Sequence, residues 1–312
     1  MDNLIFSLNA TVPVFLIILL GYILKRLGLI NENFIRTANK INFTITLPVL
    51  LFRDLLNNDV SNNFDIIYLI YCMLVTTVMF WGIWGLTKLF MKDKSMIGAF
   101  VQASFRGSVA VLGIALVQNI YGNSGAMPLV IIGAVPLFNI YSVIVLTFES
   151  SGPRAKTIKN AIIDICRNPI IIAILLGMIV SWVKIDFPGI VDTSIDLVAR
   201  MATPFALLCV GGGFEVTKAI SKIKPTIVAS LIKLFILPVL FVPVAIILGF
   251  REGELAAAIL MLGAPSTPTC YIMAKQMHND GTLSSSIIVM TTLLSAFSLT
   301  AIIYILKSFG YL

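Results

Sequence analysis

Apolar residues fill most of the chain in long runs, and short polar breaks separate these runs. Each run holds roughly 20 residues, the length that an α-helix needs to cross the hydrocarbon core of a bilayer. The breaks are rich in charged residues, glycine, proline and asparagine, which end helices. The pattern predicts an all-α integral membrane protein with ten transmembrane helices. The expected spans are 10–28, 34–55, 65–90, 95–120, 126–148, 161–183, 192–214, 225–249, 254–277 and 283–307.

The composition agrees with this interpretation and limits the partners. Apolar residues make up 58% of the chain and charged residues only 12%, against about a quarter charged in soluble domains. The net charge of +7 comes from Lys and Arg residues in the breaks rather than from one basic face, so we expect no nucleic-acid partner. The expected surroundings are membrane lipid.

The positions of the basic residues predict an orientation. Fifteen of the 22 Lys and Arg residues fall on one side of a ten-span arrangement and five on the other, while Arg106 and Lys233 lie inside spans. By the positive-inside rule this indicates a multi-pass protein of the cell (inner) membrane with both termini outside the cytoplasm. The first run follows Asp2 without a preceding Lys or Arg, so we interpret it as a span rather than a cleaved signal peptide.

The chain also contains an internal repeat. Sliding it on itself by 156 residues places the run 18–21 (ILLG) on 174–177 (ILLG), and prolines of the first two spans align as well. Residues 1–152 and 153–312 are thus expected to form two five-helix repeats. Because five is odd, the second repeat enters the membrane inverted, as in many secondary transporters.

Two spans are expected to be broken at their centres. Span nine contains the run 263–268 (GAPSTP), whose two prolines remove backbone donors and forbid a continuous helix. A shift of 157 residues places Pro265 on Ser108, within the run 104–108 at the middle of span four. Irregular backbone at this depth must line a cavity or be buried in protein. We therefore expect helices 4 and 9 to cross at their breaks, where N–H groups, positive helix ends and hydroxyls suit an anion.

The charges inside the spans are candidates for function. Arg106, in mid-span, costs at least about 2.5 to 3.5 kcal/mol on insertion scales and needs a partner, and no span has a carboxylate near its middle. Its partner is either backbone carbonyls at the broken helices or the substrate. Lys233 lies on the order of 12 Å from the inner end of span eight and is expected to extend partly toward the interface in a structural role. Arg200 follows Asp196 by four residues and should pair with it.

Several classes of protein lack their motifs here. A carboxylate-based proton antiporter needs acidic residues at mid-membrane, a metalloprotease needs HExxH, and a Ser/His hydrolase needs a histidine inside the membrane. The one histidine, His278, is expected in a loop, and the four cysteines show no CxxC spacing. We expect no enzyme activity, no metal site and no cofactor beyond a coupling ion, Na⁺ or H⁺, and we interpret the cysteines as packing residues.

Three runs resemble the auxin efflux carrier family, within the superfamily of bile-acid-type transporters. They are 105–116 (FRGSVAVLGIAL), 263–280 (GAPSTPTCYIMAKQMHND) and 291–295 (TTLLS). This family includes plant auxin carriers and bacterial malate and malonate carriers. The resemblance covers essentially the whole chain and indicates a bacterial member.

The resemblance implies an architecture and a site. Spans 1, 2, 6 and 7 would form a scaffold, and spans 3–5 and 8–10 a transport domain that moves by an elevator mechanism. The substrate carboxylate would be held where spans 4 and 9 cross, and the chain would form a homodimer through the scaffold. By position, the substrate-binding residues would be Arg106, Gly107, Ser108, Asn139, Pro265, Ser266, Thr267 and Pro268.

The hypothesis from the sequence is a secondary active transporter of a small organic anion, a mono- or dicarboxylate such as malate or malonate. Arg106 stands where many members have Asn, and the loop between spans five and six is short, which favours a metabolic carboxylate over a plant hormone. The alternatives are a sodium-coupled symporter of a bulkier amphipathic acid, bile-acid-like or auxin-like, and a channel or membrane sensor.

Overall fold

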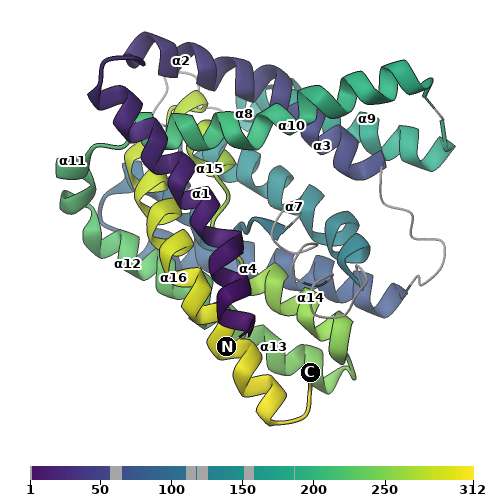
Figure 1. Ribbon diagram of the computed structural model, residues 1–312. Helices are drawn as coiled ribbons and strands as arrows, with labels where there is room; N and C mark the ends of the chain where they lie inside the picture. The colour runs from purple at the N-terminus through teal and green to yellow at the C-terminus, as the bar shows by residue number, and fades with distance from the viewer. Residues whose placement is uncertain (1, 57–64, 110–116, 118–125, 151–157, 186) are drawn as a thin grey trace.

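The computed structural model describes residues 2–56, 65–109, 117, 126–150, 158–185 and 187–312. Within these residues the regular elements are helices, and one isolated β-bridge joins two of the segments between them (Figure 1). The helices of the first half are α1 (Asp2–Arg26), α2 (Glu32–Ile41), η1 (Asn42–Thr46), α3 (Leu47–Leu56), α4 (Ile66–Phe90), η2 (Lys94–Met96), α5 (Ile97–Phe105) and α7 (Met127–Phe148).

The second half continues in the same manner. Its helices are α8 (Ile158–Cys166), α9 (Pro169–Val183), α10 (Gly189–Gly212), α11 (Val216–Ser221), α12 (Ile223–Leu231), η3 (Ile232–Ile236), α13 (Leu237–Ile247), α14 (Glu252–Gly263), α15 (Thr269–Gln276) and α16 (Gly281–Ser308).

Five helical runs among the described residues are long and apolar enough to cross a membrane. They are Ile66–Phe90, Met127–Phe148, Gly189–Gly212, Ile223–Ile247 and Gly281–Ser308. The described part of the chain is therefore all-helical, consistent with a multi-pass integral membrane protein, as the hydrophobic runs predict.

Polar residues in the breaks begin several of these helices. The carboxylate of Asp65 accepts hydrogen bonds from the backbone N–H groups of Ile67 and Tyr68, at 2.7 and 3.2 Å, and so caps α4. The carboxylate of Asp280 likewise accepts from the N–H of Leu283 at 3.0 Å and caps α16. Such caps satisfy amide groups that have no partner within the first turn.

Three expected spans differ in their details. The span expected at 161–183 is interrupted between α8 and α9, because the side chain of Asn168 accepts from the N–H of Ile170 and Pro169 starts a new helix. The spans expected at 34–55 and 225–249 contain the π-helical segments η1 and η3, and Lys233 lies within η3. The second half of the span expected at 95–120 lies mostly outside the described residues.

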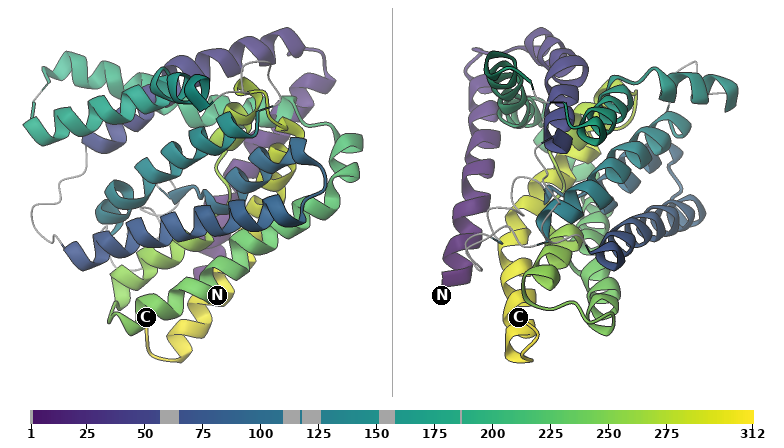
Figure 2. Two further views of the ribbon diagram at one scale, coloured as in Figure 1. Left: turned by 180° about the vertical axis from the view of Figure 1, so that it is seen from behind. Right: turned by 90° about the vertical axis from the view of Figure 1, so that its right-hand side faces the viewer.

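The helices are arranged in two groups. Helices α2, α3, α9 and α10 lie side by side along the top of Figure 1, and α1 descends from this layer. Within it α1 packs against α10, α3 against α9, and α10 against α3. The other group contains α4, α5, α7, α12, α13, α14 and α16, which pack mainly on one another and lie below the layer in both views of Figure 2.

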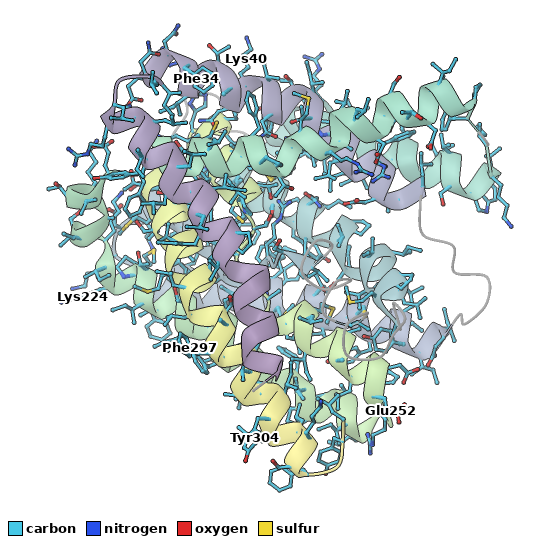
Figure 3. All side chains as sticks on the ribbon, viewed as in Figure 1. Phe34, Lys40, Lys224, Glu252, Phe297 and Tyr304 are labelled. Carbon is cyan, nitrogen blue, oxygen red and sulfur yellow. The ribbon has the colours of Figure 1, made fainter. Side chains whose placement is uncertain are left out.

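Large apolar side chains cover much of the outer surface. Trp182 and Ile247 are 86% and 82% exposed, and Figure 3 shows Phe297 and Tyr304 projecting outward from α16. A surface of this kind would aggregate in water but is suited to contact with lipid chains.

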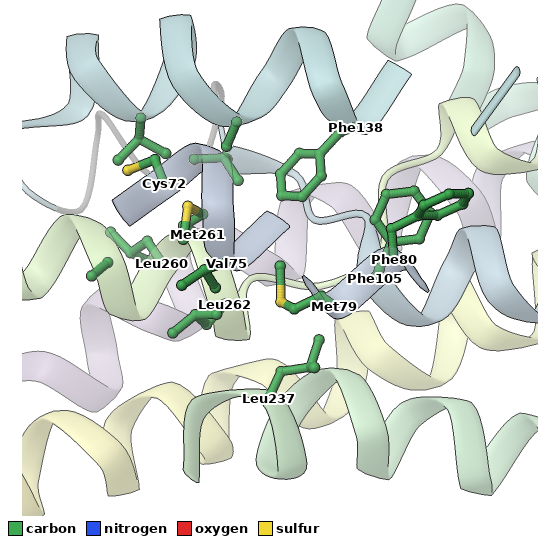
Figure 4. Close-up of a cluster of buried hydrophobic side chains, with 14 of the residues drawn as sticks. Cys72, Val75, Met79, Phe80, Phe105, Phe138, Leu237, Leu260, Met261 and Leu262 are labelled. Atoms are coloured by element: carbon green, nitrogen blue, oxygen red, sulfur yellow. The ribbon is translucent and has the colours of Figure 1, made fainter. Parts of the chain in front are cut away.

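Aromatic residues pack closely around the end of α5. The ring of Phe105 lies 5.4 Å from that of Phe80 and 5.9 Å from that of Phe138, while Phe80 stacks on Tyr141 at 4.4 Å. Figure 4 shows Phe80 and Phe105 next to each other, with Phe138 on the helix above them and Met261 of α14 further along the same core. This core holds the ends of α5 and α14 close together, where the candidate site lies.

The cysteines only partly match the prediction that they are packing residues. Cys72, Cys209 and Cys270 are buried, but Cys166 is exposed at the end of α8. The interpretation of Cys166 as a packing residue is wrong, because the helix break at Asn168 leaves the end of α8 on the surface.

Candidate functional site

Two helix breaks meet at the centre of the site. Helix α5 ends at Phe105, and the gap between α14 and α15 contains Pro265 and Pro268. Gly107 forms an antiparallel β-bridge with Ser266, and the N–H of Ser108 donates to the carbonyl oxygen of Pro265 at 2.8 Å. The two breaks therefore contact each other, as the sequence predicts, and we call the paired segments 106–108 and 264–268 the crossing.

Ser266 holds the crossing together from the side of α15. Its hydroxyl donates to the carbonyl oxygen of Ala103 at 2.6 Å, and its backbone N–H donates to the hydroxyl of Thr291 at 3.1 Å. Because the hydroxyl proton is used within the protein, Ser266 fixes the end of α5 in this arrangement rather than donating to a ligand. Thr267 and Thr269 share a hydrogen bond of 3.2 Å between their hydroxyls at the start of α15.

Arg106 is buried beside the crossing, with only 5% of its surface exposed. Its Nη2 donates to the amide oxygen of Asn139 at 2.7 Å, and its Nη1 lies 2.8 Å from the sulfur of Met273. The amide nitrogen of Asn139 is itself held by the carbonyl oxygen of Val135 at 2.9 Å. These partners use part of the N–H donors of the guanidinium, and none of them carries a negative charge.

Lys233 is completely buried on the other side of the crossing. Its Nζ donates to the carbonyl oxygen of Phe105 at 3.1 Å and to that of Met261 at 3.4 Å. The expectation that Lys233 extends toward the membrane interface is wrong. The last turns of α5 and α14 offer carbonyl groups without helical partners at their negative ends, and these compensate the ammonium group where it is.

The interior charge is uncompensated among the described residues. Arg106 and Lys233 are the charged members of the described buried set, which contains no Asp or Glu. The described ion pairs involve other residues, for example Lys88 with Glu149 at 2.9 Å. Two buried cations without a nearby carboxylate produce a positive potential that favours an anionic ligand.

The structure brings most of the predicted site residues together. Seven of them lie in the crossing, and the last two of these, Thr267 and Pro268, directly precede α15. Asn139 joins the crossing through its hydrogen bond with Arg106.

Sequence reasoning missed several members of the site. Met273 was not singled out, although it lies on α15 facing Arg106, and Gln102 donates to the same sulfur at 3.4 Å. Lys233 is expected from the sequence near the membrane interface, not at the site. Its position deep in a span is a signal that it needs carbonyl partners, and the ends of the broken helices supply them.

A separate hollow lies away from the crossing. It has a volume of about 270 Å³ and is lined mainly by apolar residues of α4, α5 and α12, among them Leu86, Phe90, Phe100 and Val228. It contains no residue of the crossing, and Thr87 is the one polar residue of its described lining, so it lacks the charged groups that would bind an anion.

Comparison with known proteins identifies the family of this chain. Residues 6–303 match a family model described as membrane transport protein. The chain belongs to this family of membrane transporters, the auxin efflux carrier family.

Three relatives illustrate the similarity. An uncharacterized transporter of Methanothermobacter thermautotrophicus is 26% identical over 298 residues, covering 94% of this chain and 96% of its own. The uncharacterized transporter YfdV of Escherichia coli (strain K12) is 24% identical over 215 residues, covering 67% of this chain and 68% of its own. A Rhizobium meliloti (strain 1021) protein whose name proposes malonate transport is 24% identical over 308 residues, covering 95% and 94%.

Proposed function

We propose that this transporter is a secondary active carrier of a small organic anion, a mono- or dicarboxylate such as malate or malonate, which binds at the crossing. The observation that carries the proposal is the burial of Arg106 beside two helix breaks, with neutral partners among the described residues. A carboxylate would supply the missing charge and accept two parallel hydrogen bonds from the planar guanidinium. The relative named for malonate transport supports this substrate class.

Helix α15 supports the same position for the anion. Its first turn begins at Thr269, directly after the crossing, so the positive end of its dipole lies there. The N–H groups of Cys270 and Tyr271 in this turn donate to the carbonyl oxygens of Thr267 and Pro268. Together with the charge of Arg106, this end of the dipole favours negative charge on the ligand side of the crossing.

The contacts between helices support two inverted repeats. Gly21 lies against Leu208, where an added Cβ would stand 2.4 Å from the backbone oxygen, and Gly177 lies against Phe52, where it would stand 3.2 Å from the backbone oxygen. The 156-residue shift carries Gly21 to Gly177 and Phe52 to Leu208. The same close contact is thus made twice, as expected when residues 1–152 and 153–312 are related by a two-fold axis.

The two groups of helices support elevator-type alternating access. Helix α1 packs on α10, α10 on α3, and α3 on α9, and these helices correspond to the proposed scaffold. The crossing and its cations lie in the other group, whose helix α16 contacts α1. Movement of that group past the scaffold would carry the anion from one side of the membrane to the other. We also propose that two copies of the chain form a homodimer through their scaffold helices. Native mass spectrometry from lipid nanodiscs would measure whether the protein is a dimer.

Transport assays with purified protein test the function directly. In proteoliposomes, uptake of a labelled small carboxylate should saturate and should be competed by related mono- or dicarboxylates, with sodium and pH gradients varied separately. Uptake without saturation would indicate a channel, and binding without uptake would indicate a sensor. Failure to bind or transport any carboxylate of the panel would contradict the proposal.

Labelling of single cysteines tests the proposed orientation, with both termini outside the cytoplasm. The exposed residues Lys92 and Lys184 lie on opposite proposed sides of the membrane. In a background without the four native cysteines, an impermeant maleimide added to intact cells should label Lys184→Cys and leave Lys92→Cys unlabelled. The reverse result would invert the orientation.

A further inference from the structure

Three carbonyl groups in the last turn of α5 accept hydrogen bonds from identified donors. The carbonyl of Gln102 accepts from the N–H of Arg106 at 3.2 Å, and that of Ala103 accepts from the hydroxyl of Ser266 at 2.6 Å. The carbonyl of Phe105, the last residue of the helix, accepts from Nζ of Lys233 at 3.1 Å. A lysine from a different helix thus completes the C-terminal end of α5.

The same ammonium group also serves the end of α14. The carbonyl of Leu260 accepts from the N–H of Ala264 at 3.0 Å, and the carbonyl of Met261 accepts from Lys233 at 3.4 Å. One buried positive charge therefore lies between the negative ends of two broken helices. In transporters with broken helices, such ends and the unwound carbonyls beside them are where a coupling cation is held.

The ammonium group of Lys233 has close neighbours at this position. A Cβ added to Gly107 would stand 3.0 Å from Nζ of Lys233, and the ring of Phe138 lies 5.9 Å from the same atom. A sodium ion at these carbonyls would replace the ammonium group or lie against it, where two positive charges in a low-dielectric interior repel strongly.

From this geometry we propose that the ammonium group of Lys233 is a tethered cation in the place of a coupling sodium ion, so that anion binding needs no sodium and removal of the lysine opens a sodium site. The claim that anion binding needs no sodium rests on the proposed anion carrier, whereas the claim that removing Lys233 opens a sodium site does not. The inference also favours a small-anion carrier over the sodium-coupled symporter that the sequence left open.

Thermal unfolding of purified variants in sodium chloride and in choline chloride of equal ionic strength tests the site. The melting temperature of the wild type should be the same in both salts. That of Lys233→Ala should be lower in choline and should rise with sodium, by about 3 °C at ten times the dissociation constant. Lys233→Met fills the space without charge and should be insensitive to sodium. Lys224→Ala, at an exposed lysine of α12 labelled in Figure 3, is the matched control.

Three results would overturn the inference. One is a folded Lys233→Ala that responds equally to sodium and choline. Another is stabilisation of the wild type by sodium, and the third is a wild type whose anion binding requires sodium. If Lys233→Ala does not fold in either salt, the inference is still tested by two measurements on the wild type, its melting temperature in sodium and the sodium dependence of its anion binding. If the wild type binds no carboxylate, the proposed function fails, while the sodium titration of Lys233→Ala separately decides the tethered-cation inference.

Discussion

Arginines occur in two different electrostatic settings in this protein. Where α3 meets α10, Arg53 and Arg200 both pair with the carboxylate of Asp196, the latter at 2.6 Å. At the crossing, Arg106 binds an amide oxygen and a thioether. The first group, which we call the arginine–aspartate cluster, is complete in itself, whereas the second lacks an anion among the described residues.

We interpret the arginine–aspartate cluster as a structural contact between helices and Arg106 as a ligand-binding residue. A carboxylate between two guanidinium groups gives both arginines an anionic partner and links the helices. The positive charge that remains is not buried, because Arg200 is 72% exposed, so the cluster needs no ligand. A buried guanidinium with neutral partners keeps its net charge, and an arriving anion gains the full interaction in a medium of low dielectric constant. The proposed scaffold and the proposed anion site follow these two designs.

The largest expected effect is at Arg106. Replacement by Gln removes the charge, and replacement by Lys keeps the charge but loses the planar fork. A charged hydrogen bond is worth roughly 1.5 to 3 kcal/mol, so carboxylate affinity should fall about ten- to a hundredfold, less for Lys than for Gln. Isothermal titration or a scintillation proximity assay on purified protein measures this.

The control for this series is Arg251, an exposed arginine that also binds neutral groups, the carbonyls of Ile246 and Phe250. Arg251→Gln should leave carboxylate affinity unchanged. If Arg106→Gln is well folded and binds as tightly as the wild type, the anion binds elsewhere and the comparison between the two regions fails. If Arg106→Gln does not fold while Arg106→Lys folds and binds normally, Arg106 serves as a structural anchor.

The second effect concerns packing between the helices of the proposed scaffold. A Cβ at Gly211 would stand 1.8 Å from the backbone oxygen of Ile18, so Gly211→Ala must push α1 away from α10. We expect a loss of about 1 to 3 kcal/mol in stability, seen as a lower melting temperature, with carboxylate affinity kept. Gly85→Ala, where an added Cβ meets nothing within 4 Å, should not lower the melting temperature. Loss of affinity without loss of stability in Gly211→Ala would contradict the division of roles.

The third prediction adds a carboxylate to the crossing, so that Arg106 gains an acidic partner like the arginines of the arginine–aspartate cluster. Asn139 accepts a hydrogen bond from Arg106 at 2.7 Å, so Asn139→Asp would place a carboxylate on the guanidinium. The internal ion pair would cancel the charge that an anion needs, and carboxylate affinity should fall by about tenfold or more, about 1.4 kcal/mol per decade. Asn139→Ala removes the hydrogen bond without adding charge and should have a smaller effect. Unchanged affinity in Asn139→Asp would place the anion away from Arg106.

Much of the fold could be predicted because its signals are local. The apolar runs predicted α4, α7 and α16 to within a few residues, and the proline pair 265 and 268 predicted the gap between α14 and α15. The pairing of Arg200 with Asp196 is confirmed, because the two residues are four apart on one helix.

The rest depends on contacts between distant parts of the chain. The sequence shows how far Lys233 lies from the end of its helix, but not that two carbonyl groups from other helices lie within reach of its ammonium group. Met273 has no charge to draw notice, and its contact with Arg106 follows from the packing of α15 against α5. Side-chain direction in a bundle is set by neighbours that a single run of sequence does not reveal.

The smallest expected effect comes from removing the carboxylate of the arginine–aspartate cluster. Asp196 is 17% exposed and lies between Arg53, 28% exposed, and Arg200, 72% exposed. Because partly exposed ion pairs contribute little to stability, Asp196→Asn should lower stability by only about 1 kcal/mol. The contribution should come mainly from Arg53, so Arg53→Gln should lower the melting temperature more than Arg200→Gln. Carboxylate affinity should stay at the wild-type value in all three variants, since the cluster lies in the other group of helices from the crossing. If a folded Asp196→Asn loses as much carboxylate affinity as Arg106→Gln, the arginine–aspartate cluster and Arg106 act as a single site.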